Sequence, residues 1–117
     1  MISATSSALS ALAAFSTRLQ SHASNIANAQ SEGYTATRVT LAAGTQGGVI
    51  AEIDRPAAAG PLPQGIDAGG VEPVEFPNVE LGREIPEMIL NSRYYQANLK
   101  TIQQENDMLD SLLDLKI

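Results

Sequence analysis

Two long segments with heptad-like apolar spacing, one at each end of the chain, constrain the fold most strongly. In residues 2–29 and 79–116, apolar side chains recur three and four positions apart, the spacing of helices that pack along a shared seam. The sequence therefore predicts terminal helices that pair as an antiparallel, coiled-coil-like hairpin. The seam positions singled out are Leu9, Leu12, Leu19 and Ile26 in the first helix and Met88, Tyr95, Leu99, Ile102, Leu109 and Leu113 in the second.

The middle of the chain, residues 30–78, differs in composition because it contains every Pro except Pro86 and every Gly except Gly82. Alternating side chains at 35–42 and 49–54, on either side of a Gly-rich stretch at 44–48, predict a short β-hairpin. The Pro and Gly residues of 55–77 predict an extended loop. We expect the 117 residues to form a single, mainly α-helical domain.

The start of the second helix is ambiguous because of Pro86. A proline is favourable in the first turn of a helix but costs about 3 kcal/mol deep inside one. The helix therefore begins near Glu84, or a short turn from Val79 precedes a kink at Pro86. In the second case Asn78 would be the N-terminal cap.

The composition offers little catalytic chemistry. The chain has no Cys, so disulfides, thiolate metal sites and Cys nucleophiles are excluded. The only histidine, His22, has no partner at a specific spacing, and we expect it to be structural or exposed. Glu80, Glu84 and Glu87 fit the first turn of a helix, whose dipole they complement. We therefore expect no enzyme activity, no cofactor, no metal and no small-molecule substrate.

The charge and hydropathy pattern also limits the partners. A formal net charge of −6 opposes binding to the phosphate backbone of nucleic acids. No apolar run reaches the roughly 18 residues that a membrane span requires, and the N-terminus lacks the features of a cleaved secretion signal. We expect no nucleic-acid partner and no membrane insertion.

Two paired helices would not cover all of the apolar side chains. The apolar content is rich in Ala, which buries little area at roughly 25 cal/mol per Å². Several larger side chains lie partly off the shared face, namely Phe15, Ile89, Leu90, Tyr94 and Leu112. A sheet layer or another subunit must cover them, so we expect helices that are completed by partners.

One short motif lies at the end of the first helix. It consists of Asn25, Ile26, Ala27 and Asn28, a short spacer, and then Gly33 and Tyr34. Asn25 and Asn28 would offer their amide groups to free carbonyls at the helix end, and Gly33 permits a turn with positive φ. Tyr34 would then start the strand.

This motif resembles the signature of bacterial flagellar rod and hook proteins, which reads Asn-(Ile/Leu)-Ala-Asn, a short spacer and Thr-x-Gly-Tyr. Ser31 stands here where the family has Thr. The C-terminal segment resembles the family's other pattern, with Asn78-Val79-Glu80-Leu81 followed by Arg93-Tyr94-Tyr95-Gln96-Ala97-Asn98, although Pro86 departs from it. Because the middle segment is short, the resemblance is to the small proximal-rod members.

The resemblance implies a structural role in the basal body of the bacterial flagellum. Such proteins are exported through the flagellar type III apparatus and polymerise into the periplasm-spanning rod through their terminal helices. The implied partners are other copies of the chain, other rod subunits and the export apparatus. The alternative is a cytoplasmic helical adaptor or export chaperone of the flagellar system.

Overall fold

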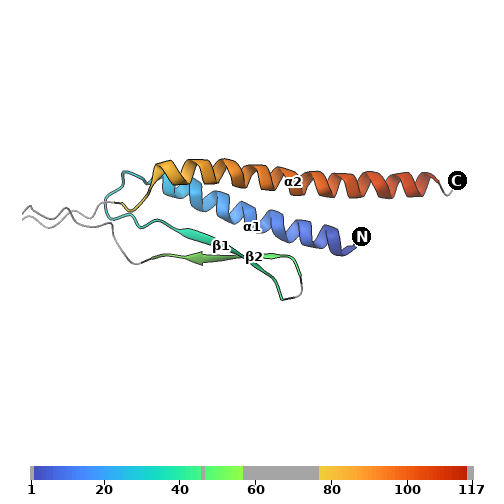
Figure 1. The fold of residues 1–117 in the computed structure, drawn as a ribbon, viewed down its shortest axis with the longest axis horizontal. Coiled ribbons are helices and arrows are strands. Elements are labelled where there is room, and N and C mark those ends of the chain that lie inside the picture. Colours follow the sequence, from blue (N-terminus) through green and yellow to red (C-terminus); the bar gives the residue numbers. More distant parts are fainter. Residues whose placement is uncertain (1, 46, 57–76, 116–117) are drawn as a thin grey trace, which may run out of the picture.

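The computed structural model describes residues 2–45, 47–56 and 77–115, and within them two long helices flank a β-hairpin in sequence order. Helix α1 spans Ile2–Ala27, strand β1 Arg38–Ala43, strand β2 Val49–Asp54 and helix α2 Leu81–Asp114. The two helices lie side by side and antiparallel, and the hairpin runs along α1 (Figure 1). This architecture confirms the predicted mainly helical fold. The loop predicted at 55–77 lies almost wholly outside the described residues.

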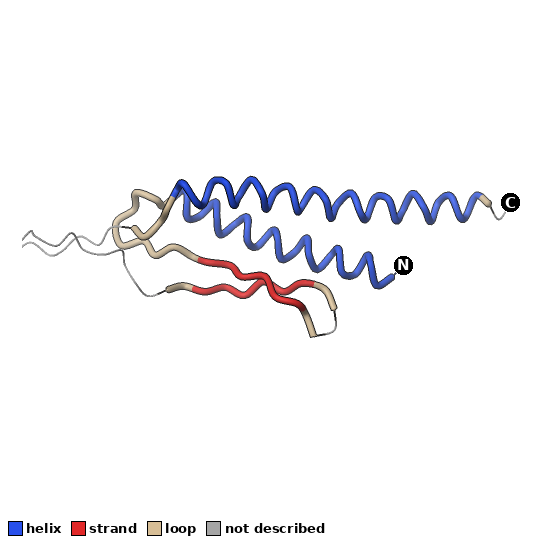
Figure 2. The backbone as a smooth tube through the Cα atoms, viewed as in Figure 1, coloured by secondary structure: helices blue, strands red, loops and turns tan. Residues whose placement is uncertain are grey.

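Helix α1 is the central element, because it contacts α2 on one side and both strands on the other (Figure 2). Its face toward α2 includes Phe15, whose ring stacks on Tyr94 with ring centroids 5.7 Å apart. The buried apolar side chains of the described residues are mostly alanines: Ala8, Ala11, Leu12, Ala14 and Ala36. The core is therefore thin, since each alanine removes little apolar area from water.

The face of α1 that meets α2 is offset by one residue from the predicted seam. Residues Ala4, Ala8, Ala11, Phe15, Arg18 and His22 have the spacing of one helix face, and Phe15, Arg18 and His22 contact side chains of α2. Leu9 is 63% exposed, whereas Leu12 is buried and Leu19 and Ile26 are half-buried. Apolar periodicity alone did not distinguish these faces because Ala and Ser occupy positions on both.

On α2 the predicted seam positions divide into two groups. Met88, Tyr95 and Ile102 are half-buried, whereas Leu99, Leu109 and Leu113 are exposed. The exposed leucines, together with Leu9, contribute little to the pairing of the two helices within the chain. Their role as contacts between subunits stays a prediction.

Helix α2 begins at Leu81, between the two starting points that the sequence left open. Glu80 occupies the N-cap position without a side-chain cap, and its carbonyl accepts the N–H groups of Arg83 and Glu84, both at 3.0 Å. Pro86 lies in the second turn, where its missing N–H removes one bond close to the helix start. Asn78 is thus not the cap that the second alternative assumed.

Strands β1 and β2 pair antiparallel, from Arg38 opposite Asp54 to Ala43 opposite Val49. The second strand has its predicted bounds, whereas the first begins later than the predicted residue 35. The turn is closed by the N–H of Gly44, which donates to the carbonyl of Gly48 at 3.0 Å. The hairpin is attached to α1 by the N–H of Val49, which donates to Oγ of Ser10 at 3.1 Å.

Gly48 permits this close approach, and replacing it with Ala should weaken the contact between the hairpin and α1. Its φ is +84°, and a Cβ atom there would overlap the side chain of Ser10. Gly47→Ala is the matched control, because Gly47 also has positive φ, +88°, but a Cβ there meets nothing within 4 Å. We expect Gly48→Ala to lower the free energy of unfolding by about 1–2 kcal/mol more than Gly47→Ala. Urea denaturation measures the difference, and equal losses would contradict this packing role.

Candidate functional site

The family-motif residues lie together where α1 ends and the chain turns toward the hairpin. The helix ends at Ala27, and the side chain of Asn28 then donates from Nδ2 to the carbonyl of Ser24 at 2.9 Å. Ser31 Oγ donates to Oδ1 of Asn28 at 3.2 Å. Gly33 has φ +68°, the left-handed conformation that the sequence predicted for it. These contacts reverse the chain so that it runs back along α1.

Asn25 is the centre of the motif, with only 1% of its surface exposed. Its Nδ2 donates to the carbonyl of Thr37 at 2.8 Å, and its Oδ1 accepts the N–H of Thr37 at 2.9 Å. Tyr34 also donates its hydroxyl to this Oδ1, at 3.0 Å. The side-chain amide therefore pairs with both the N–H and the carbonyl of Thr37, as the backbone of a neighbouring β-strand would.

This role of Asn25 differs from the predicted one. We expected both asparagines to bind free carbonyls at the end of the helix, and of the two only Asn28 does so. Asn25 lies one turn earlier, on the face of α1 that meets the segment leading into β1. Ser21, one turn before it on that face, donates its hydroxyl to the same Thr37 carbonyl at 2.7 Å. The sequence did not predict this hydrogen bond, because the spacing between Ser21 and Thr37 matches no known motif.

Asn78 connects the C-terminal motif to the same site. Its Oδ1 accepts the N–H of Ala36 at 2.7 Å, and Ala36 is 2% exposed. The adjacent residues 36 and 37 are thus held by an asparagine from each terminal segment, Asn25 and Asn78. The structure brings together the two motifs that the sequence showed only as separate patterns.

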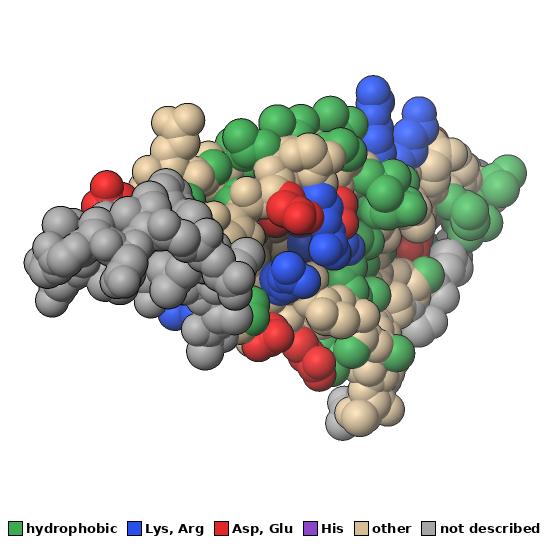
Figure 3. Space-filling view, turned by 60° about the vertical axis from the view of Figure 1, so that its left-hand side comes forward, with side chains coloured by type: hydrophobic (Ala, Val, Ile, Leu, Met, Phe, Trp, Pro, Cys, Tyr) green, Lys and Arg blue, Asp and Glu red, His purple; other side chains and the backbone are tan. Residues whose placement is uncertain are grey.

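A cluster of charged side chains fastens the end of α1 to the start of α2. Nδ1 of His22 lies 2.6 Å from Oε2 of Glu84, a residue 62 positions away in the sequence. Glu87 accepts a hydrogen bond from Nε of Arg83 at 3.0 Å and lies 3.8 Å from Nη2 of Arg18. Acidic and basic side chains gather side by side on this face of the molecule (Figure 3).

His22 therefore has a partner, Glu84, that its position in the sequence did not reveal. The ring is buried and contacts Glu84, which agrees with the structural alternative for this histidine, although no partner was expected for it. The contact depends on the antiparallel pairing of α1 with α2, which places residues 22 and 84 side by side. The contact between His22 and Glu84 could have been predicted only by aligning the two predicted helices antiparallel to each other.

The electrostatics of this cluster favour the charged form of Glu87. The hydrogen bond from Arg83, helped by the positive charge of that guanidinium, lowers the pKa of Glu87 from its ordinary value of 4.5, although partial burial opposes the shift. The same interaction raises the pKa of Arg83. Glu87 thus stabilises the fold as a carboxylate.

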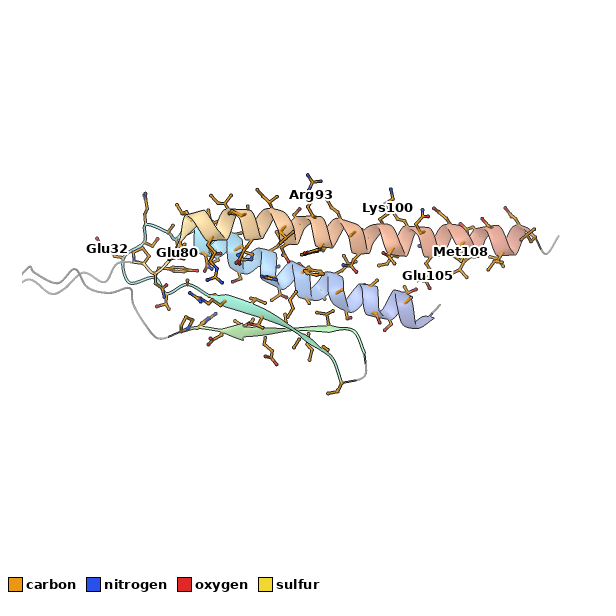
Figure 4. The ribbon with its side chains drawn as sticks, in the orientation of Figure 1. Glu32, Glu80, Arg93, Lys100, Glu105 and Met108 are labelled. Atoms are coloured by element: carbon orange, nitrogen blue, oxygen red, sulfur yellow. The ribbon has the colours of Figure 1, made fainter. Side chains whose placement is uncertain are left out.

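Replacing Arg83 with Gln should raise the pKa of Glu87 toward 4.5. Because the folded-state pKa of Glu87 is depressed, its stabilising effect is present above pH 4.5 and is lost as the pH falls through the folded-state value. The variant should therefore lose stability at neutral pH and approach the unsubstituted chain at lower pH. An NMR titration of the Glu87 carboxyl checks the shift. Arg93→Gln is the control, since Arg93 points away from this cluster (Figure 4), and an unchanged Glu87 pKa in Arg83→Gln would contradict the assignment.

The site is a set of hydrogen bonds and ion pairs that holds together three segments of the chain: the end of α1, the segment leading into β1, and the start of α2. We call this region the joint. Within the described residues, no group of three or more His, Cys, Asp or Glu side chains is placed to hold a metal ion. Among the described helices, none is long and apolar enough to cross a membrane. What the geometry supports is the positioning of α1, the hairpin and α2 relative to one another.

Comparison with known proteins identifies both terminal segments. The family described as flagellar basal body rod FlgEFG protein C-terminal matches residues 73–115. The family described as flagella basal body rod protein matches residues 6–35. Among curated proteins, the comparison found no significant match. The two family matches contain nearly all of both helices together with Asn25, Tyr34 and Asn78, the residues that form the joint.

Proposed function

The chain belongs to the flagellar basal-body rod proteins, and on this basis we propose that it is a rod subunit that is exported by the flagellar type III apparatus and polymerises through its terminal helices. Membership of the family makes it a structural component of the basal body that assembles with other rod subunits. The observation that carries the proposal of polymerisation is an apolar end of α2 that no other described part of the chain covers.

The length of this uncovered end follows from how the helices pair. His22 contacts Glu84 and Phe15 stacks on Tyr94, while Ala4 lines a hollow with residues of α2 up to Met108. The rest of α2 continues past the start of α1 (Figure 1). We call residues 109–115, which follow this hollow, the C-terminal overhang.

The C-terminal overhang is rich in exposed apolar side chains. Each of its larger apolar residues is more than two-fifths exposed, Leu113 at 67% and Leu115 at 82%; the full set is Leu109, Leu112, Leu113 and Leu115. Met108 and Glu105 point to the side of α2 on which α1 lies, whereas Arg93 and Lys100 point away from it (Figure 4). A helix end of this composition is stabilised when a second subunit covers it.

A second apolar surface lies along the first half of α2. Ile85, Ile89 and Leu90 are exposed, in agreement with the expectation that Ile89 and Leu90 lie off the face shared by the helices. Tyr94 is also about half exposed, but its ring stacks on Phe15 of α1, so these two residues take part in the helix contact, contrary to the expectation that they lie partly off it. Two distinct apolar surfaces on one subunit permit a head-to-tail contact, which generates an open helical assembly when it does not close into a ring. The subunit would then add to the growing rod by burying both.

The short middle segment supports a place in the proximal rod, because the sequence resembles the small member called rod protein C more than the members with large β domains. Export fits the thin, Ala-rich core, since a marginally stable chain unfolds readily to pass through a narrow channel. Folding of the overhang is then completed at the assembly site, where neighbouring subunits bury it.

The competing function is a cytoplasmic helical adaptor or export chaperone. Cell fractionation of the source bacterium separates the two, with the export apparatus intact or inactivated. A rod subunit leaves the cytoplasm only when the export apparatus is intact, and it accumulates inside the cell when that apparatus is inactivated. Equal retention in the cytoplasm of both strains would exclude export and favour the adaptor.

A further inference from the structure

The outer face of the first half of α2 is apolar and basic. Ile85 and Ile89 are exposed, and Arg93 follows at the next four-residue step and points away from α1 (Figure 4). Side chains four positions apart on a helix are neighbours, so these three residues form one continuous row. We call them the basic row. The two acidic side chains of this half of the helix, Glu84 and Glu87, contact α1 instead.

The C-terminal overhang has the complementary character. Leu109 and Leu113 are exposed and also lie four positions apart. Asp110 and Asp114 form a second row beside them, and they are the charged residues of 109–115. The overhang thus presents apolar and acidic side chains, whereas the basic row presents apolar and basic ones. The charges of the two surfaces therefore attract when their apolar side chains meet.

The overhang and the basic row also match in spacing and length. Rows of side chains at four-residue intervals on one helix pack into the grooves between such rows on another helix. The leucines at 109 and 113 and the isoleucines at 85 and 89 have this spacing. At a rise of about 1.5 Å per residue, the overhang is about 10 Å long and the basic row about 12 Å. Each surface is therefore long enough to cover the other.

The overhang cannot pack on the basic row of its own chain, because Leu109 and Ile85 lie about 36 Å apart along one helix. Packing against the overhang of a second copy is disfavoured, since Asp110 and Asp114 would then face the same two carboxylates. Such a symmetric contact would also close a dimer, whereas a rod requires a contact that repeats. A second copy that offers its basic row meets both conditions.

We propose that the C-terminal overhang of one copy binds the basic row of the next copy, with Leu113 beside Ile89 and Asp114 paired with Arg93. The leucines contribute the apolar area of the contact, and the charges exclude the pairing of two overhangs. Every copy carries both surfaces, so the contact repeats from copy to copy. The inference rests on the proposed function, because it names the surface through which the proposed polymerisation proceeds.

Disulfide cross-linking in purified hook–basal bodies tests the contact. The natural chain has no Cys, so Ile89→Cys together with Leu113→Cys introduces two defined thiols at exposed positions. A disulfide requires Cβ atoms about 4 Å apart, so these two positions cannot be bridged within one chain. After mild oxidation we expect covalently linked copies on a denaturing gel. Each single Cys variant should remain monomeric, and so should Leu113→Cys combined with Glu52→Cys, an exposed position of β2.

Charge reversal is an independent test that needs no Cys. Asp114→Arg places two cations against each other and should lower incorporation into basal bodies by at least about fivefold, with a matching loss of swimming motility. Arg93→Asp added in the same chain restores an attractive pair and should return both to near the parent level. Lys100→Asp is the matched control, because Lys100 also points away from α1 but lies about 10 Å further along the helix than Arg93 (Figure 4). It should not rescue Asp114→Arg.

Basal bodies that contain the doubly substituted Cys chain but yield no linked copies would overturn the proposed contact and leave the proposed function intact. Failure of Arg93→Asp to rescue Asp114→Arg would overturn the contact as well, and so would equal rescue by Lys100→Asp. These two results apply even if the Cys variant does not assemble. Absence of the unsubstituted chain from basal bodies would instead contradict the proposed function, and the contact with it.

Discussion

Replacing Asn25 with Leu is expected to lower the free energy of unfolding by about 3 kcal/mol, one of the two largest effects that this structure predicts. The substitution leaves the partly buried N–H of Thr37 without its acceptor, and it removes one of the two partners of the Tyr34 hydroxyl, which keeps only Ser24 Oγ among the described residues. Within the part of the chain that the structure describes, the carbonyl of Thr37 then keeps only the hydrogen bond from Ser21. For a chain of 117 residues the melting temperature should fall by roughly 10 °C, as measured by circular dichroism.

The matched control for this prediction is Asn28→Ala. Asn28 belongs to the same motif, but it lies nearer to the surface and its amide binds only the carbonyl of Ser24 and the hydroxyl of Ser31. We expect this variant to lose less than about 1 kcal/mol, because water can replace its hydrogen bonds. Equal losses in the two variants would show that Asn25 has no special part in holding the segment that leads into β1.

The other large effect is expected on assembly. Leu109→Asp combined with Leu113→Asp places two charges on the C-terminal overhang, where both leucines are exposed in the single chain. The stability of the isolated protein should change by less than about 1 kcal/mol, since exposed positions tolerate substitution. Incorporation into the rod should fall by at least tenfold, because covering each carboxylate with a second subunit would remove it from water. Swimming motility and the yield of assembled basal bodies measure the loss.

Ser111→Asp is the control for added charge on the overhang. It introduces a carboxylate on the same two turns but on the opposite face from the two leucines, and Ser111 is exposed. This variant should remain motile. Normal motility of the double leucine variant would contradict the assignment of the overhang as a contact between subunits, and loss of motility in Ser111→Asp would show that charge alone is responsible.

The heptad spacing predicted the two helices and their antiparallel pairing, yet it misplaced the contact face on α1 by one position. The reason is visible at Leu9 and Ala8, because a large leucine suggests burial while the smaller alanine is the residue that faces α2. Where a helix contact is made by small side chains, hydrophobicity does not mark it. Large apolar residues on such a helix remain available for another partner.

The candidate site shows a different limit of the sequence. The importance of Asn25, Gly33 and Tyr34 could be predicted from the motif, and the positive φ of Gly33 followed from its lack of a side chain. The partners of Asn25 could not be predicted, because its hydrogen bonds go to the backbone of Thr37, which any residue type supplies. The contacts of His22 with Glu84 and of Asn78 with Ala36 join distant parts of the chain and appear only after the helices are aligned.

The most direct test of the central claim is quantitative mass spectrometry of hook–basal bodies purified from the source bacterium. The proposed function predicts that this chain is present there in several copies per particle, at a constant ratio to the other rod subunits. Its absence from the particles, together with abundance in the cytosol, would contradict a structural role in the rod and would favour the adaptor or chaperone.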